Sequence, residues 1–145
     1  MQVKFKKLRP DAITPTYATD GSAGLDFYVP ADHVVGGVLS GRTFTINTGI
    51  SVDIPHGFAL LMLSRSGHGF KHQVRLTNCV GLIDSDYRGE ISIQLMNDSE
   101  VSMLINPGDR IAQGVIVPVP AVELVEVEEL SETARGEGGF GSTGK

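Results

Sequence analysis

The sequence predicts an all-β protein: one domain built as a β-barrel or jelly roll, with one short helix and a flexible C-terminal tail. Segments that alternate apolar and polar residues recur along the chain, as they do in half-buried strands. Eighteen glycines and seven prolines interrupt these segments at short intervals, which is typical of compact β-sandwiches and barrels. A length of 145 residues suffices for one domain with a sizeable core.

The first elements follow from charge and periodicity. The basic residues within 4–9 are expected on an edge strand, where charge discourages unwanted pairing. Residues 44–54 alternate apolar and polar side chains, the two-residue period of a half-buried strand. Residues 58–63 are apolar on both faces and are expected at the centre of a sheet. Only residues 66–72 predict a short helix.

The later elements surround a polar turn. Residues 81–83 and 91–95 are expected to be the two strands of a β-hairpin, joined by the polar segment between them. Three further strands are expected at residues 101–105, 111–119 and 122–127. The folded domain is expected to cover residues 1–130, and residues 131–145 are expected to form a flexible, glycine-rich lid.

Charge and cysteine content narrow the functional classes. A net charge of −5 argues against broad nucleic-acid binding. The N-terminus lacks an apolar targeting core, and no stretch has membrane-spanning length. Cys79 is the only cysteine, so no intrachain disulfide can form and a reducing compartment is expected. We therefore expect a cytoplasmic protein whose partners include neither nucleic acid nor membrane.

The polar turn offers a candidate general base. Asp84 directly follows the apolar residues Gly81–Ile83, and we expect it to be only partly solvated there, an environment that suits a base. Tyr87 adds a flat ring and Arg88 a fixed cation. The alternative is an ordinary surface turn with polar residues.

Three further segments suggest phosphate contacts. Arg65 and the Ser66 hydroxyl stand at the start of the expected helix, where they would complete a phosphate cradle, although an ordinary serine N-cap is the alternative. Gln113 interrupts an apolar strand face, so its amide needs a structural partner or a ligand phosphate. Asp26 lies inside an apolar strand, which indicates either a salt bridge to an arginine or a water-mediated metal site.

Two remaining patterns concern the helix and the tail. His68 and His72 are spaced one helical turn apart, but no third ligand nearby supports a metal site. The tail places Arg135, Phe140 and two hydroxyls among glycines. Arginine clamps phosphates, phenylalanine stacks on bases and glycine lets backbone amides approach a phosphate. The tail therefore resembles a lid that orders on a nucleotide, with a disordered terminus as the alternative.

In this order the segments resemble one family, the all-β, trimeric deoxyuridine triphosphatases (dUTPases). The resemblance covers almost the whole chain, and the third and fifth of the family's motifs are the most specific. The matching segments are residues 23–28, 64–67, 78–89, 108–113 and 135–144. The resemblance implies a jelly roll of the dUTPase type and Mg²⁺-assisted hydrolysis of dUTP to dUMP and pyrophosphate. That reaction keeps uracil out of DNA and supplies dUMP for thymidylate synthesis.

The resemblance also implies residue roles. Asp84 matches the base that activates water for attack on the α-phosphorus, and Tyr87 matches the ring that packs on deoxyribose and excludes a 2′-hydroxyl. Asp26 matches the acidic residue near the magnesium ion, through water. The uracil site is matched by Asn78, Gly81 and Ile83; the phosphate contacts by Arg65, Ser66, Gly67 and Gln113; and the closing lid by Arg135, Phe140, Gly141, Ser142 and Thr143.

The family assembles each site from three subunits, so the resemblance implies an obligate homotrimer. Two positions depart from the second motif: Ser64 replaces a usual proline, and His68 replaces an apolar residue. Neither replaces a phosphate contact, so altered loop rigidity is expected rather than lost activity. The rival hypotheses are a dCTP deaminase, which shares the fold, a nucleotide-responsive protein that signals to a partner, and a purely structural jelly roll.

Overall fold

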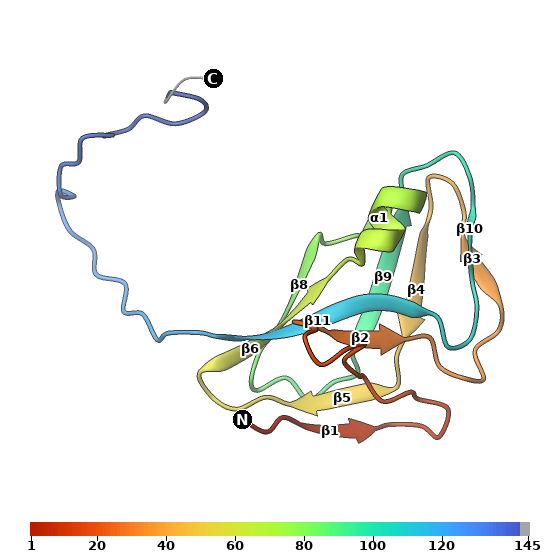
Figure 1. The fold of residues 1–145 in the computed structure, drawn as a ribbon. Coiled ribbons are helices and arrows are strands. Elements are labelled where there is room, and N and C mark those ends of the chain that lie inside the picture. Colours follow the sequence, from red (N-terminus) through yellow and green to blue (C-terminus); the bar gives the residue numbers. More distant parts are fainter. Residues whose placement is uncertain (143–145) are drawn as a thin grey trace.

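The computed structural model describes residues 1–142, and in this part of the chain it has eleven strands and one helix (Figure 1). In chain order they are β1 (Lys4–Lys7), β2 (Leu25–Tyr28), β3 (Gly36–Val38), β4 (Thr43–Asn47), β5 (Ile50–Asp53), β6 (Phe58–Leu63), α1 (Ser66–His72), β7 (Val74–Leu76), β8 (Val80–Ile83), β9 (Ser92–Asn97), β10 (Met103–Ile105) and β11 (Arg110–Pro118). The all-β prediction is therefore confirmed.

The described strands pair in four open sheets rather than in a closed barrel. Of the two predicted architectures, the jelly roll is therefore the correct one. A four-stranded sheet has the order β2-β11-β6-β8, and a three-stranded sheet has the order β4-β9-β7. Two-stranded pairs, β1-β5 and β10-β3, complete the set, and all pairings are antiparallel.

A core of aliphatic side chains joins these sheets. Phe27 from β2, Leu60 from β6 and Ile111 from β11 are each no more than 1% exposed. They belong to one buried cluster with Ile46 of β4 and Leu95 of β9. Burial of such side chains contributes roughly 1.5–3 kcal/mol each, and this shared core therefore holds the two larger sheets together.

Two expected elements are confirmed closely. The apolar segment β6 lies inside its sheet between β11 and β8, and none of its residues is exposed, in keeping with its apolar side chains on both faces. The helix α1 covers the predicted residues and ends at Gln73, which adopts the left-handed conformation with φ 52° and donates its N–H to the Gly69 carbonyl. Lys71 and His72 in its last turn suit the negative end of the helix dipole.

The predicted β-hairpin is wrong. β8 pairs with β6, whereas β9 pairs with β4 and β7, so residues 84–91 cross from one sheet to another. A hairpin and a connection between two sheets have the same local pattern, because a polar turn between two apolar segments does not specify whether those segments pair with each other. The segment thus links the two larger sheets.

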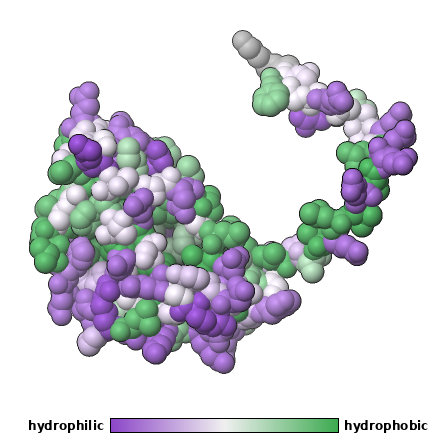
Figure 2. All heavy atoms as spheres, turned by 180° about the vertical axis from the view of Figure 1, so that it is seen from behind, coloured by the Kyte–Doolittle hydropathy of each residue, from purple (hydrophilic) through white to green (hydrophobic). Residues whose placement is uncertain are grey.

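The predicted strand at 122–127 is also wrong. After β11 the chain leaves the body and runs away from it in an extended path (Figure 1). Its apolar residues are exposed, among them Val122, Leu124, Val125 and Leu130 at 70–95%, and Figure 2 shows apolar groups along this segment. Strands need a hydrogen-bonding neighbour, and the described part of this chain offers none to these residues. The domain boundary near residue 131 stays a prediction.

Candidate active site

The register of the four-stranded sheet brings three of the predicted segments together. Gln113 in β11 lies opposite Asp26 in β2 on one side and opposite Leu63 in β6 on the other. Arg65 follows Leu63 by two residues, at the point where β6 leads into α1. Residues far apart in the sequence are therefore neighbours at one end of this sheet.

Asp26 is the centre of this cluster. Its side chain is almost fully buried, and its Oδ1 atom lies 3.4 Å from the Nε of Arg65 and 3.4 Å from the Nε2 of Gln113. Its Oδ2 atom accepts a hydrogen bond of 3.1 Å from the Nη1 of Arg110. A buried carboxylate is tolerated only when it is paired, and here two arginines and an amide pair it. The salt-bridge alternative is thus present, and Gln113 has a structural partner.

The same cluster holds Arg65 in place. Besides its ion pair with Asp26, Arg65 donates from Nη1 to the main-chain carbonyl of Arg110 at 3.1 Å. Its side chain keeps 22% exposure. The guanidinium is therefore fixed on its inner side while part of it reaches solvent, as a group that clamps a phosphate requires. Sequence reasoning missed Arg110, although it lies within the segment 108–113 that had been singled out.

The cluster predicts a specific loss of stability. Asp26→Ala would remove the counter-charge of two arginines whose side chains are 22% and 44% exposed. Because solvent reaches part of both guanidinium groups, we expect the free energy of unfolding to fall by about 1–3 kcal/mol. Denaturant unfolding at fixed protein concentration measures this change. Asp98→Ala is the matched control, because it breaks the exposed pair between Asp98 and Arg75 and should change stability little. Equal losses in both variants would contradict the central role of Asp26.

The serines before the helix do not act as N-caps. Arg65 occupies the N-cap position, and no side-chain hydrogen bond caps the helix. Ser64 instead accepts the N–H of Leu76 on its hydroxyl at 2.9 Å, which ties the turn before α1 to β7. Ser66 is exposed, and a Cβ added at Gly67 would meet nothing within 4 Å. Both residues therefore face open space beside Arg65.

His68 is buried inside α1, and its Nδ1 atom has no partner in the described structure. Burial, followed by the nearby charges of Arg65 and His72, lowers its pKa from 6.5 to about 4, against a smaller opposing effect of Asp109. The ring is therefore neutral at neutral pH. Among residues 1–142, no three side chains of His, Cys, Asp or Glu are grouped to hold a metal ion, so the spacing with His72 does not mark a metal centre.

This lowered pKa predicts acid sensitivity. Because the folded pKa lies below the unfolded value, the stabilisation is complete above pH 6.5 and is lost as the pH falls towards 4. Between pH 7 and pH 5 we expect a loss of about 1–2 kcal/mol that depends on this group, after allowance for solvent near the helix surface. Urea unfolding at both pH values tests it, with His68→Leu as the comparison. A variant that loses as much stability as the parent would rule out His68 as the cause.

The predicted uracil site borders a small hollow. Asn78 and Gly81, together with Ile83 and Gln94, line a space of about 220 Å³ next to Met62. Gly81 lies opposite Met62 in the pairing of β8 with β6, and a Cβ at Gly81 would approach the Met62 Cβ to 3.0 Å. Glycine therefore fits where two strands approach closely. The hollow is bordered by the Asn78 amide and by the backbone of β8.

Tyr87 and Asp84 lie beyond the end of β8. The Tyr87 N–H donates to the Asp84 carbonyl at 3.2 Å and its hydroxyl donates to the Glu90 carbonyl at 3.0 Å. Asp84 is exposed, which corrects the expectation of partial solvation. β8 is an edge strand of its sheet, and within the turn that follows it Arg88 donates from Nη1 to the Ser85 carbonyl at 2.7 Å. Asp84 lines a second hollow of about 760 Å³ with His56, Asp86 and Ala121.

One chain does not bring Asp84 to Arg65. Ile83 lies opposite Leu60, near the start of β6, whereas Arg65 follows the end of that strand. About six residues of extended chain separate the two ends, or about 20 Å at the rise of a β-strand. Asp84, the candidate general base, and Arg65, the candidate phosphate contact, thus lie at opposite ends of β6.

The tail is equally remote in the described structure. Arg135 donates from Nε to the Gly138 carbonyl at 2.7 Å, and Phe140 is fully exposed with φ 48°. Gly141 and Ser142 lie in the same exposed turn. Thr143, the last predicted lid residue, lies outside the described residues. The structure therefore brings together the predicted phosphate contacts, but not the base or the lid.

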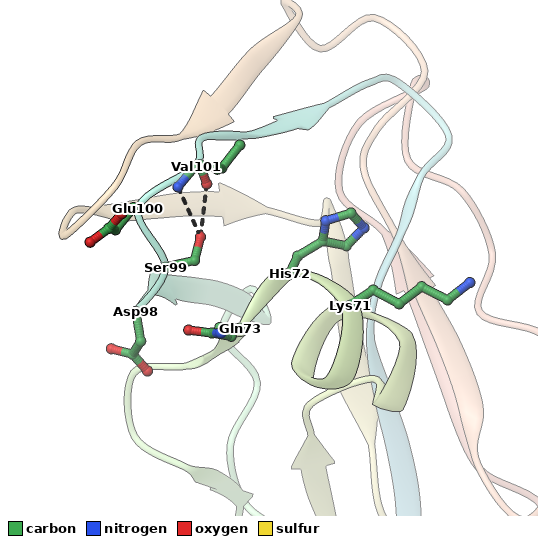
Figure 3. Close-up of a pocket in the computed structure, with 7 residues that line it drawn as sticks. All are labelled: Lys71, His72, Gln73, Asp98, Ser99, Glu100 and Val101. Carbon is green, nitrogen blue, oxygen red and sulfur yellow. Dashed lines mark hydrogen bonds between the residues drawn. The ribbon is translucent and has the colours of Figure 1, made fainter.

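A third hollow, of about 680 Å³, lies at the C-terminal end of α1 and is shown in Figure 3. Lys71 and His72 border it from the helix, and residues 98–101 border it from the turn between β9 and β10. Their side chains diverge rather than converge on one point (Figure 3). It contains none of the predicted site residues, so we do not assign it to the active site.

The fold is all-β, with a buried carboxylate paired by two arginines at one end of the four-stranded sheet and a separate small hollow beside β8. A family model for dUTPases matches residues 11–144. The deoxyuridine 5′-triphosphate nucleotidohydrolase of Nautilia profundicola is 46% identical over 145 residues, all of both chains. The Staphylococcus bacteriophage 80alpha dUTPase with dUPNHPP has a TM-score of 0.86 at 30% identity, over 99% of each chain.

A third similar protein concerns the metal. A mutant dUTPase of phage phi11 of Staphylococcus aureus, described for its coordination of a structural Mg(II) ion, has a TM-score of 0.81 at 25% identity over 91% of this chain and 100% of that one. With the match of the family model, these likenesses identify the class of enzyme. The chain belongs to the dUTPase family, the deoxyuridine triphosphate nucleotidohydrolases. The one helix in residues 1–142 is neither long nor apolar enough to cross a membrane.

Proposed function

We propose that the chain hydrolyses dUTP to dUMP and pyrophosphate in a Mg²⁺-assisted reaction, at a site built from three copies of the chain. The observation that carries this proposal is the cluster around Asp26, which holds Arg65 and Gln113 at one end of a sheet. Membership of the dUTPase family supplies the substrate. The cytoplasm is the location we propose, in keeping with the single cysteine, Cys79.

In this proposal Arg65 binds the phosphates, with Ser66 and Gly67 in the open space beside it. Asp26 acts through Arg65, because its ion pairs fix the direction of the guanidinium. The side-chain amide of Gln113 would lie between Asp26 and the substrate and would contact both. These contacts would stabilise the negative charge that develops on the phosphate oxygens during hydrolysis.

The donor set fits a magnesium ion that arrives with the nucleotide. Mg²⁺ retains water and binds the oxygens of a triphosphate, so it does not need a cage of protein carboxylates. Asp26 already pairs with two arginines, and it would therefore contact the ion only through a bound water. When bound, the ion would neutralise phosphate charge and orient the triphosphate chain.

The base and sugar are recognised on the other side of β6. Asn78 and the backbone at Gly81 and Ile83 would hydrogen-bond the edge of uracil, which explains rejection of cytosine by donor and acceptor pattern. Tyr87 would pack on deoxyribose and leave no room for a 2′-hydroxyl. Asp84 directly follows Ile83 and precedes Tyr87 by three residues, so the water that it activates would lie close to the sugar end of the triphosphate.

The separation of about 20 Å between Asp84 and Arg65 within one chain favours a site shared between subunits. One copy would supply Asp84 and Tyr87, a second the Arg65 cluster, and a third the lid residues Arg135 and Phe140. The exposed apolar residues of the tail segment 122–130 suit burial against another copy. Light scattering at assay concentration should give the mass of a trimer.

The experiment that tests the reaction is pyrophosphate release from dUTP, dTTP, dCTP and UTP, each with and without Mg²⁺. We expect turnover of dUTP alone, and its loss without the metal. Ammonia release from dCTP would instead identify a deaminase on the same fold. Binding of dUTP without any turnover would identify a nucleotide-responsive protein, and the search would move to its partners.

A further inference from the structure

We propose that the ion pair between Arg9 and Glu90 is a positioning device for Tyr87 and sets how strongly the site rejects a ribonucleotide. This inference rests on the proposed packing of Tyr87 against deoxyribose. Neither Arg9 nor Glu90 touches the substrate in this proposal. Both would act through the loop that carries the tyrosine.

The orientation of Tyr87 is set by the backbone that follows it. Its hydroxyl donates to the carbonyl of Glu90 at 3.0 Å. Its ring lies so closely against Gly89 that a Cβ added there would collide with the ring carbon Cζ. The ring therefore moves with residues 89 and 90, and any shift of that backbone would be carried to the face that we expect to meet the sugar.

The side chain of Glu90 anchors this backbone to a distant part of the chain. One carboxylate oxygen, Oε1, accepts both from the Nη1 of Arg9 at 3.0 Å and from the N–H of Gly49 at 2.6 Å. Gly49 has φ +72°, and a Cβ there would lie 2.6 Å from the Cβ of Ala12. Glycine is needed at this position, and its N–H meets the carboxylate.

Arg9 is itself held from three sides. Its Nε lies 3.1 Å from the Oδ1 of Asp11, its Nη1 bonds Glu90, and its Nη2 donates to the carbonyl of Asn47. A guanidinium with three partners in one plane has a fixed direction. The carboxylate of Glu90 is thereby fixed as well.

Neighbouring contacts show that this is the point where the loop meets the core. Ser51 donates its hydroxyl to the Arg88 carbonyl at 2.8 Å, and the N–H of Ile91 donates to the Ile50 carbonyl at 2.8 Å. These bonds hold the loop at both sides of Glu90. The Arg9–Glu90 pair lies between these two hydrogen bonds in the chain, and in this proposal it determines the tilt of residues 89 and 90.

The side chains of Arg9 and Glu90 are 35% and 27% exposed. Both side chains are partly exposed, so the pair contributes less to stability than a fully buried pair would. Removal of the pair should therefore leave the fold intact and loosen the loop. A loosened loop would let Tyr87 retreat by the small distance that a 2′-hydroxyl requires, so that selectivity falls while the chemical step on dUTP is kept.

The test compares kcat and KM for dUTP and for UTP in Arg9→Met, which keeps an unbranched apolar stem without the guanidinium, and in Glu90→Gln, which keeps the shape of the side chain. We expect the ratio of kcat/KM for dUTP to that for UTP to fall about tenfold, the scale on which a pocket discriminates one small group. The kcat for dUTP should stay within about twofold of the parent. Lys4→Met is the matched control, because Lys4 is an exposed cation near the same edge and should leave the ratio unchanged.

Equal losses for both nucleotides, or an unchanged ratio, would overturn the proposal and leave the pair a purely structural role. For any variant that is too unstable to assay, the ratio of dissociation constants for the imido analogues of dUTP and UTP, measured at low temperature, shows whether discrimination in binding has fallen. If the parent protein itself does not distinguish dUTP from UTP, the proposed role of Tyr87 fails and this inference fails with it. Failure of the Tyr87 role is thus seen in the parent protein, whereas failure of the Arg9–Glu90 inference alone is seen only in the variants.

Discussion

Asp84→Asn is expected to reduce kcat for dUTP at least about 100-fold, the scale typical of the loss of a general base, while leaving the fold unchanged. Asparagine has nearly the shape of aspartate, but its amide cannot take a proton from water. Asp84 is exposed and lies at the end of the edge strand β8. Its substitution therefore disturbs no core packing, and the melting temperature should not change.

Asp86→Asn is the matched control for this variant. Asp86 lines the same hollow of about 760 Å³ as Asp84 and is also exposed. The Asp86→Asn variant therefore shows the effect of losing one negative charge in the turn while the general base Asp84 is kept. The binding of dUPNHPP should be close to that of the parent in both variants. Turnover of dUTP by Asp84→Asn at near the parent rate would rule out Asp84 as the base.

Much of the fold follows from local pattern. The alternation within β9 and the uninterrupted apolar run of β6 are direct consequences of burial on one face or on two. The helix α1 has no competing strand pattern over its residues. Such elements are predictable because the physical cause of the element lies within the segment itself.

Pairing is less predictable, because it depends on residues elsewhere in the chain. The turn at Asp84 has the composition of a hairpin, yet β8 and β9 join different sheets. Residues 122–127 have the alternation of a strand but find no partner in the part of the chain that the structure describes. A strand that pairs with another copy of the chain has the same sequence pattern as a strand that pairs within its own chain.

The candidate site divides in the same way. Asp26 could be recognised because a charge inside an apolar strand needs a partner, and an arginine was expected there without being specified; Arg65, which was expected only to contact phosphate, is one of the two partners. Arg110 was missed because an arginine after a turn has no unusual local feature. The pair of Arg9 and Glu90 was missed because the two residues are 81 positions apart. They become neighbours because β1 pairs with β5 and because the Ile91 N–H donates to the Ile50 carbonyl.

Truncation after Ala134 is expected to reduce kcat/KM for dUTP at least about 100-fold, since it removes an arginine that would bind phosphate and a ring that would cover the base. Stability should not change, because the described hydrogen bonds of residues 135–142 stay within the tail and its approach at Thr133. Glu137→Gln, which alters the charge of the tail without removing either group, is the control and should retain activity.

The two inactive chains can also be combined, and their mixture tests how the site is built. If Asp84 and the lid come from different subunits, trimers reassembled from the truncated chain and from Asp84→Asn contain some sites with a normal Asp84 and a normal lid. Such mixtures should regain a fraction of parent activity, although each chain alone has almost none. If each chain instead folded its own tail over its own Asp84, no mixture could form a complete site, and activity would stay at the level of the separate variants.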